Sequence, residues 1–452
     1  MSHEVGRRDG DLLPLGEATR TWFAISLQTF GGPAGQIAVM QHHLVDKKRW
    51  IGQQRFLHAM NYCMLLPGPE AQQLAIYIGW LLNGTAGGLI AGILFVLPGV
   101  VALLALSFLY VGLGDSLAVS ALFAGLAPAV IAIVVQAVQR VGRRSLHNAL
   151  LVGLAVAAFL ALVLFGAPFP AVVLAAGAIG LLFGPSLLSS SHGARDDGEE
   201  PPLLPDDALH HATPSGRRSA LVLVVGLVLW FAPVLAVSVT IGSTDVFTDQ
   251  ALFFSGAAVV TFGGAYAVLA YVAQQAVNVY GWLAPGEMVR GLALAETTPG
   301  PLIMVVQFVA FVGAYRQPGD LDPWVAAVLA SLLVTWVTFV PCFLFVLLGA
   351  PYVERLRSNA RLGKALSGIS AAVVGVIASL ALFFALHTLF GETTRWSPGP
   401  VDLEVPVWST WQPEAFALTA LGLFSVFVLR WSPLRTLALC GVAGAVLTLV
   451  TH

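Results

Sequence analysis

The run Thr29-Phe30-Gly31-Gly32-Pro33, followed by Pro67-Gly68-Pro69, sets the organisation of this 452-residue chain. The first run interrupts the apolar stretch 18–45, and the second interrupts the apolar stretch 53–83. Proline removes a backbone donor and glycine permits conformations that other residues avoid, so neither stretch is predicted to form one continuous helix. We expect each break to separate two half-helices.

The same pair of breaks returns 232 positions later in the chain. Phe262-Gly263-Gly264 interrupts the stretch 249–280, and Pro299-Gly300-Pro301 interrupts the stretch 283–314. The register holds without a gap over 41 residues with ten identities. Beyond a polar insertion, Pro98 matches Pro341 and Gly125 matches Gly368 at a spacing of 243. A period held over this length indicates an internal duplication.

The composition excludes a soluble protein. Hydrophobic residues make up 57% of the chain and charged residues only 10%, with a mean hydropathy of +0.83. A soluble domain carries roughly 25% charged residues, so this chain lacks the polar surface that water requires. The lipid bilayer is the expected partner. The net charge of −2 leaves no basic stripe for phosphates, so no nucleic-acid partner is expected.

No cofactor and no metal site is predicted. The cysteines Cys63, Cys342 and Cys440 lie far apart in apolar stretches, which argues against a disulfide framework or a metal cluster. His210-His211 lies in a polar linker, where a solvated pair is the preferred interpretation. Residues 1–16 contain no apolar core and no small-residue cleavage site, so no removable signal peptide is expected.

Nine uninterrupted apolar segments are candidates to cross a hydrocarbon core, which needs roughly 20 residues as a helix. They are 86–111, 117–139, 147–165, 168–188, 219–241, 324–349, 365–390, 414–430 and 433–451. The predicted fold is therefore an all-α polytopic membrane protein with two inverted-topology repeats, each with two broken, re-entrant helices plus full transmembrane helices. The expected divisions are a first repeat with connecting spans (1–188), a polar cytoplasmic linker (189–218), a second repeat with its preceding span (219–412) and a C-terminal helical hairpin (413–452).

Basic residues predict the orientation of the chain. They gather in alternate loops, at 46–55, 140–144, 217–218, 355–364 and 430–435. Cytoplasmic loops collect lysine and arginine, so the N-terminus is expected in the cytoplasm and the C-terminus outside a bacterial inner membrane. Five full spans separate the two pairs of breaks, and this odd number gives the repeats opposite orientations. If the broken stretches instead crossed the membrane fully, the number of spans between the repeats would still be odd. The basic loop 46–55 would then lie outside.

Paired broken helices in inverted repeats are typical of a transporter's binding site near the membrane midplane. A helix that begins at such a break presents free amides and the positive end of its dipole. Several of these ends together favour an anion, without a buried arginine. The predicted substrate-binding residues are Phe30, Gly31, Gly32, Pro33, Pro67, Gly68, Pro69, Phe262, Gly263, Gly264, Pro299, Gly300 and Pro301. The alternative is that glycine and proline only allow close helix packing.

Polar side chains beside the breaks allow two interpretations each. Glu70 and Glu296 are candidates for proton coupling, since buried carboxylates bind protons more readily, or else they cap helix starts. Gln72, Gln73 and Gln307 either line a polar path or join helices by hydrogen bonds.

Two further pairs of residues stand at equivalent positions of the two halves. Arg290 corresponds to His58, and these side chains either attract an anion or extend to the membrane interface. Trp50 corresponds to Trp282, and both are interpreted as interfacial anchors.

The order of motifs resembles the chromate ion transporter family. The motifs are Phe30-Gly31-Gly32-Pro33, a basic loop, Trp50, Leu66-Pro67-Gly68-Pro69, Tyr77-Ile78-Gly79 and Leu97-Pro98. The second half looks like the second domain of the family's long-chain members, so the resemblance covers residues 18–390. It implies efflux of chromate, driven by the electrochemical gradient, and hence chromate resistance. In one departure, Ala265-Tyr266 stands where a further glycine or proline is expected.

The predicted function is a secondary transporter that exports chromate or a similar tetrahedral oxyanion, coupled to protons or another ion. Sulfate is also a tetrahedral dianion, so uptake of sulfate or another inorganic anion is an alternative, as is a passive anion channel. No Gly-x-Ser-x-Gly, no His-Glu-x-x-His and no paired intramembrane aspartates are present, so no enzyme and no catalytic residue is predicted. A homodimer is left open.

Overall fold

The computed structural model describes residues 13–114, 116–183, 215–240, 245–262, 264–353 and 359–451. These residues are mostly helical, which confirms the predicted all-α polytopic membrane class. Among them, six helices are long and apolar enough to cross a membrane. They are α4 (Glu70–Leu113), α5 (Leu117–Ser145), α8 (Gly216–Thr240), α13 (Pro323–Gly349), α15 (Ala360–Leu389) and α17 (Pro433–Thr451).

The interrupted stretches form shorter helices in two corresponding sets. The first set is α1 (Leu15–Ser26), α2 (Gly32–Gln41), the π-helix η1 (His42–Lys47) and α3 (Gln53–Cys63). The second set is α9 (Val246–Val260), α10 (Ala265–Gln274), the π-helix η3 (Gln275–Val279) and α11 (Pro285–Thr297), followed by the 3-10 helix η4 (Leu302–Met304) and α12 (Val305–Arg316). A shift of 232 positions aligns the two sets, π-helices included.

The remaining elements connect or cover this core. They are α6 (Ala149–Phe165), α7 (Phe169–Phe183), α16 (Pro413–Phe427), and the 3-10 helices η5 (Ala350–Tyr352) and η6 (Trp408–Thr410). The strands β1 (Thr393–Trp396) and β2 (Leu403–Pro406) pair antiparallel, with Thr393 opposite Pro406. The sequence predicted no element between the spans 365–390 and 414–430. Apart from residues 215–218, the predicted linker 189–218 lies outside the described residues.

The helix α4 folds back on itself. Asn83 and Gly84 have non-helical dihedrals, with φ of −138° and +57°. A Cβ added to Gly79 would lie 2.5 Å from the carbonyl oxygen of Gly87, whereas residues eight apart in a straight helix are about 12 Å apart. The chain therefore reverses at Asn83-Gly84, between the broken stretch 53–83 and the predicted span 86–111.

Helix α5 packs against α15, α16 and α17, and α15 packs in turn against α6 and α7. Small residues bring these backbones close together, as is common between membrane helices. A Cβ at Gly125 of α5 would lie 2.0 Å from the carbonyl oxygen of Cys440 in α17. The hairpin formed by α16 and α17 therefore packs directly on the core.

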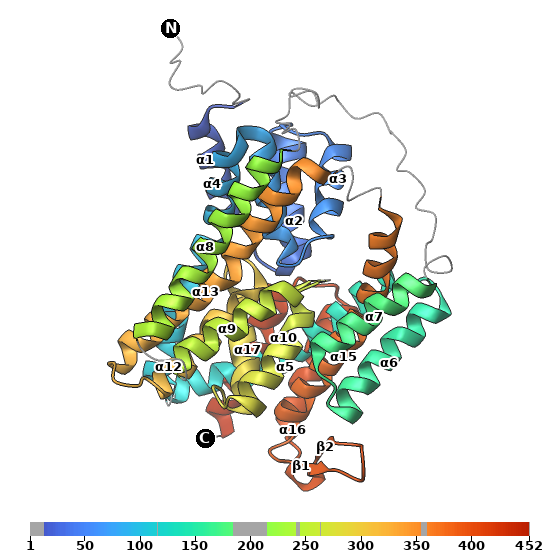
Figure 1. Ribbon diagram of the computed structural model, residues 1–452. Coiled ribbons are helices and arrows are strands. Elements are labelled where there is room, and N and C mark those ends of the chain that lie inside the picture. Colours follow the sequence, from blue (N-terminus) through green and yellow to red (C-terminus); the bar gives the residue numbers. More distant parts are fainter. Residues whose placement is uncertain are drawn as a thin grey trace.

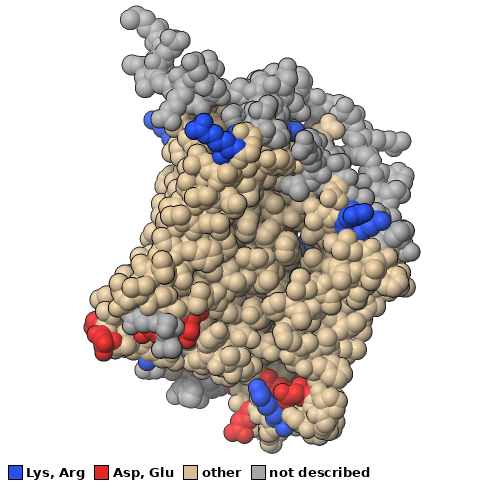
Figure 2. Space-filling view, in the orientation of Figure 1, with Lys and Arg blue, Asp and Glu red and all other residues tan. Residues whose placement is uncertain are grey.

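The molecule has two ends that differ in charge. In Figure 1, α1 and α3 lie towards the upper end, and the β1–β2 hairpin and the carboxyl terminus lie at the lower end. Figure 2 shows basic side chains towards the upper end and acidic side chains at the lower end, where basic side chains also lie beside them. We call these the α1 end and the hairpin end.

The prediction that Trp50 and Trp282 are interfacial anchors is wrong. Their exposed fractions are 3% and 1%, so neither ring faces lipid headgroups. Trp282 stacks on Tyr280 with 4.3 Å between ring centroids, and Lys48 lies 5.4 Å from the ring centroid of Trp50. Each tryptophan follows a π-helix, and tertiary packing buries its ring in the turn that leads to the next helix.

We predict that Gly79→Ala destabilises the protein, because its methyl group would overlap the backbone of Gly87. Overpacking of this kind costs about 1–3 kcal/mol. The matched control is Gly153→Ala in α6, where an added Cβ meets nothing within 4 Å. Thermal unfolding in detergent should show a lower Tm for Gly79→Ala only. An equal Tm for both variants would contradict the reversal in α4.

Candidate functional site

The broken stretches of the first half begin and end at the α1 end of the molecule. Lys48, just after η1, forms an ion pair with Glu17 in the first turn of α1, at 2.8 Å. Asn83, at the close of the second stretch, donates from its amide to the carbonyl of Leu13 at 2.7 Å. The chain therefore runs from the α1 end to the breaks and back twice.

The second half follows the same path from the opposite end. The guanidinium of Arg316, at the end of α12, binds the carboxylate of Glu287 in α11 with N–O distances of 2.6 and 2.8 Å. A Cβ on Gly319 would lie 3.2 Å from the carboxylate of Asp245, just before α9. Tyr110 donates to Glu287 at 2.9 Å. Since Tyr110 lies roughly 40 Å along α4 from its turn, these contacts belong to the hairpin end.

Backbone hydrogen bonds join the breaks across the two halves. The N–H of Gly68 donates to the carbonyl of Thr261 at 2.8 Å, and the N–H of Gly300 donates to the carbonyl of Thr29 at 3.0 Å. Both donors and both acceptors are 232 positions apart, so the same contact is made twice. We call this meeting point the junction. In it, each Pro-Gly-Pro break is bound to the Phe-Gly-Gly break of the other half.

The backbone at the junction requires glycine. The φ angle is +79° at Gly31, +126° at Gly68, +105° at Gly264 and +103° at Gly300, in a region that other residues rarely adopt. Helices α2, α4, α10 and η4 begin at these breaks without a side-chain cap. Side-chain caps are present at α5, α6, α9, α13 and α15, but α1, α3 and α16 also lack one. The structure thus brings the predicted breaks together, although Gly263 itself lies outside the described residues.

Buried amide side chains accompany the junction. Gln36, Gln72, Gln73 and Gln307 are each at most 1% exposed. The amide of Gln36 donates to the carbonyl of Gly300, from one half to the other. Among the described residues, the amide oxygens of all four glutamines have no hydrogen-bond partner. An unpaired buried polar group is unfavourable. Among the four, Gln72 also has its amide nitrogen unpaired within the described residues, so it offers a free donor.

The sequence contains a signal for Gln36, which was not among the predicted site residues. It lies one helical turn after Gly32, and it is the only amide or charged side chain of α2 before the last residue of that helix. Its carbonyl partner, Gly300, is 264 positions away. No local pattern predicts that contact.

Glu296 is buried beside the second break, at 1% exposed. It accepts a hydrogen bond from the hydroxyl of Tyr266, and Arg140 of α5 interacts electrostatically with both side chains. A Cβ on Gly32 would lie 3.9 Å from the Tyr266 hydroxyl. Tyr266, which stands where a glycine or proline was expected, therefore donates to Glu296 beside the break of the first half.

The other predicted polar residues lie in different surroundings. Glu70 begins α4 and interacts electrostatically with Arg144. Neither α4 nor η4 has a side-chain cap, so the alternative role of the two glutamates as caps is not seen. Arg290 is not brought to the junction: its guanidinium lies 5.8 Å from the ring of Phe123, and it lines a separate pocket with His387.

These features define a class of protein. The chain is a multi-pass α-helical membrane protein whose broken helices meet inside the fold, an architecture typical of transporters. The Chromate transporter family matches residues 16–181 and 248–445, one stretch in each half. The chain belongs to the chromate transporter family.

Several relatives are similar over most of their length. A chromate transport protein of Pseudomonas aeruginosa is 33% identical over 367 residues, which cover 80% of this chain and 79% of the relative. A chromate transport protein of Cupriavidus metallidurans is 27% identical, covering 80% of each chain. A probable chromate transport protein of Synechococcus elongatus is 25% identical, covering 83% of this chain and 86% of the relative.

The matches identify a transport protein and not an enzyme. No solved structure matches this chain.

We predict that Gln36→Ala destabilises the protein, because the carbonyl of Gly300 loses its side-chain donor. Leaving a buried polar group without a partner costs about 1–3 kcal/mol. The matched control is Gln28→Ala, which removes an exposed amide whose partners, Ala24 and His43, both lie in the first half. Unfolding in detergent should show the loss for Gln36→Ala alone. Equal stability of the two variants would contradict the contact between the halves.

Proposed function

We propose that this protein is a secondary transporter that exports chromate, or a similar tetrahedral oxyanion, across a bacterial inner membrane. The anion is held at the junction by the amino-terminal ends of the half-helices. The observation that carries this proposal is the reciprocal pair of bonds between Gly68 and Thr261 and between Gly300 and Thr29. These bonds bring the four breaks, and the helix starts beside them, to one place.

The geometry indicates which amides are left for the anion. The N–H groups of Gly68 and Gly300 are already donated to the opposite half, and proline at positions 69 and 301 has none. The first amides of α4 and of η4 follow directly, and the first N–H groups of a helix have no partner within it. With the starts of α2 and α10, they give a set of donors backed by helix dipoles, which suits an oxyanion.

The substrate follows from family membership and from the relatives. The relatives from Pseudomonas aeruginosa and Cupriavidus metallidurans are named as chromate transport proteins. The donors proposed at the junction are neutral backbone amides, while Arg140 and Arg144 act electrostatically on the glutamates beside the breaks. Neutral amide donors suit a dianion that must leave again after binding. Sulfate has the same shape and charge, so uptake of sulfate and passive anion flow are the outcomes to be tested against chromate export.

The orientation is part of the proposal. Both broken stretches of the first half return to the α1 end, and those of the second half return to the hairpin end. Inverted repeats make this pattern. Lys48 lies beside Glu17 at the α1 end, and Arg218 lies over the ring of Trp80 near the turn of α4, so we place this end and the N-terminus in the cytoplasm.

Glu296 is the side chain that we assign to proton coupling. It is buried beside the break, is bonded to Tyr266 and has one carboxylate oxygen without a partner among the described residues. Arg140 supplies a nearby positive charge. A proton on Glu296 changes the charge beside the anion without changing the fold, which links proton binding to anion binding. Glu70, with Arg144 nearby, is the equivalent candidate at the first break.

The double variant Gly68→Val, Gly300→Val should abolish transport, because both glycines have positive φ and closely packed surroundings. Gly399→Val is the matched control, since Gly399 also has positive φ but an added Cβ meets nothing within 4 Å. Radioactive chromate should load inverted vesicles made with the wild type or the control. It should not load inverted vesicles of the double variant, provided that immunoblots show equal insertion.

Right-side-out vesicles separate the alternatives. Export predicts that chromate loads only the inverted vesicles. Loading of right-side-out vesicles with sulfate would indicate uptake, and loading of both kinds without any gradient would indicate a channel. Normal transport by the double variant would contradict the junction as the site.

Glu296→Gln should leave chromate flux independent of an imposed pH gradient, because the amide cannot bind the proton. Glu392→Gln, an exposed acid outside the junction, is the control and should retain the dependence of the wild type. The measurement is the initial rate of chromate loading into inverted vesicles at several pH gradients. An unchanged dependence in Glu296→Gln would eliminate this carboxylate as the coupling group.

A further inference from the structure

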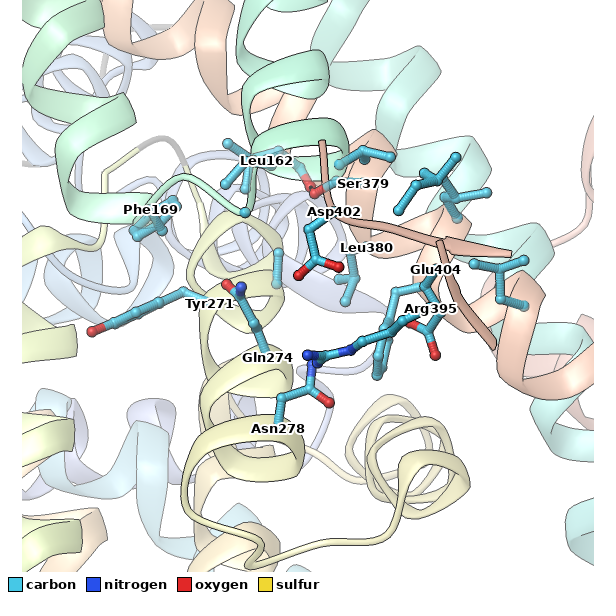
Figure 3. Close-up of a pocket in the computed structure, with 18 residues that line it drawn as sticks. Leu162, Phe169, Tyr271, Gln274, Asn278, Ser379, Leu380, Arg395, Asp402 and Glu404 are labelled. Carbon is cyan, nitrogen blue, oxygen red and sulfur yellow. Dashed lines mark hydrogen bonds between the residues drawn. The ribbon is translucent and has the colours of Figure 1, made fainter. Parts of the chain in front are cut away.

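A pocket with several polar side chains lies at the hairpin end, away from the junction. It lies between the end of α6, the start of α7, α10 with η3, α15 and the β1–β2 hairpin. Figure 3 shows Arg395 of β1 reaching across this pocket towards Gln274 and Asn278, with Asp402 and Ser379 on another wall. The proposed transport site does not use any of these side chains.

Three of these side chains offer unused hydrogen-bond donors. Gln274 and Asn278 are four positions apart, at the end of α10 and in η3, so they share a face. Gln274 is partly buried, whereas Asn278 and Arg395 are exposed, so solvent reaches their donors. Within the described part of the chain no protein hydrogen bond or ion pair engages these donors, although Arg395 acts electrostatically on Glu404. A guanidinium presents five N–H donors in a planar fork that matches tetrahedral and carboxylate oxyanions.

The acidic groups of the pocket are engaged to different extents. Glu404 accepts from the Thr393 hydroxyl at 2.7 Å and lies 3.1 Å from Nε2 of His387. The hydrogen bond from His387 holds the pKa of Glu404 below its ordinary value. Nδ1 of His387 lies 2.9 Å from the carbonyl of Phe383, so both ring nitrogens face acceptors.

Asp402 is the remaining acid of the pocket. It accepts a hydrogen bond from Ser397 at 2.8 Å, and Figure 3 shows its carboxylate at the cavity. The negative charge of Asp402 repels any anion that the positive charge of Arg395 attracts. The pocket is therefore expected to hold an anion more weakly than the junction does.

One structural element connects the pocket to the junction. Helix α10 begins just after Gly264, at a break, and continues through η3 to Asn278. Fourteen residues of helix extend over roughly 20 Å. The pocket thus lies at the outer end of a half-helix whose inner end is at the junction, on the side to which the proposed export would deliver the anion.

We propose that this pocket is a second oxyanion site, in which Arg395, Gln274 and Asn278 hold a tetrahedral dianion at the exit of the transport route. The identity of the anion rests on the proposed function, whereas the donors are those of the pocket itself. The ligand is the free dianion in solution. A lipid phosphate group has related chemistry and is separated from it by the test.

The test is equilibrium dialysis of purified, full-length protein in detergent against radioactive chromate. The wild type should bind a tight and a weak equivalent. Arg395→Gln should weaken only the weak equivalent, about ten-fold, since one charge-assisted donor pair is lost. Asp402→Asn should tighten it a few-fold, roughly as expected for removing one nearby like charge. Arg435→Gln, an exposed arginine outside the pocket, is the control and should bind as the wild type does.

The outcomes separate this site from the junction. If Gly68→Val, Gly300→Val removes the tight equivalent and leaves the weak one responsive to Arg395→Gln, both sites stand. If Arg395→Gln and Asp402→Asn both bind as the wild type does, the second site is overturned while the junction stands. If only the weak equivalent exists, the junction fails and the second site stands. Displacement of the weak equivalent by phosphatidylglycerol but not by sulfate would assign the pocket to lipid and overturn the proposal.

Discussion

Two backbone hydrogen bonds, from Gly68 to Thr261 and from Gly300 to Thr29, are the constraint on which the rest of the fold depends. Lipid satisfies no backbone donor or acceptor, at several kcal/mol for each group left unpaired. A helix interrupted inside the membrane therefore needs another part of the protein to complete it. Here each half completes the break of the other, so neither pair of breaks is expected to be stable alone. The duplication thus supplies the partner that each broken helix requires.

The two halves share this frame but do not carry the same side chains. The position facing Gly300 is Gly99, and the corresponding position facing Gly68 is Cys342, 243 residues later. Gln36 extends from the first half to the second break. Tyr266 and Glu296 pair only within the second half. The backbone of the junction is thus nearly symmetric, while its titratable and donor side chains are not, which is a suitable basis for coupling a dianion to a proton.

Sequence alone predicted the parts that local composition determines. Apolar length gave six of the nine predicted spans, while the segments 147–165, 168–188 and 414–430 form the shorter helices α6, α7 and α16. Glycine with proline gave the four breaks, whereas the turn at Asn83-Gly84 was not predicted. What the sequence did not predict depends on contacts between distant segments. Trp50 resembles an interfacial residue until the packing of the fold buries it. Gln36 has no visible role until Gly300 lies beside it. The β1–β2 strands are too short and too polar to be distinguished from a loop in sequence. A binding role for Arg395 is recognisable only when the fold places it near Gln274 and Asn278.

The central claim is that a tetrahedral oxyanion binds where the four breaks meet. Anomalous diffraction from crystals grown with selenate, a tetrahedral dianion with a strong anomalous scatterer, tests it most directly. The account predicts an anomalous peak within hydrogen-bonding distance of the first amides of α4 and η4, close to Gly68 and Gly300. A fully occupied peak elsewhere in the protein, with none at the junction, would contradict it.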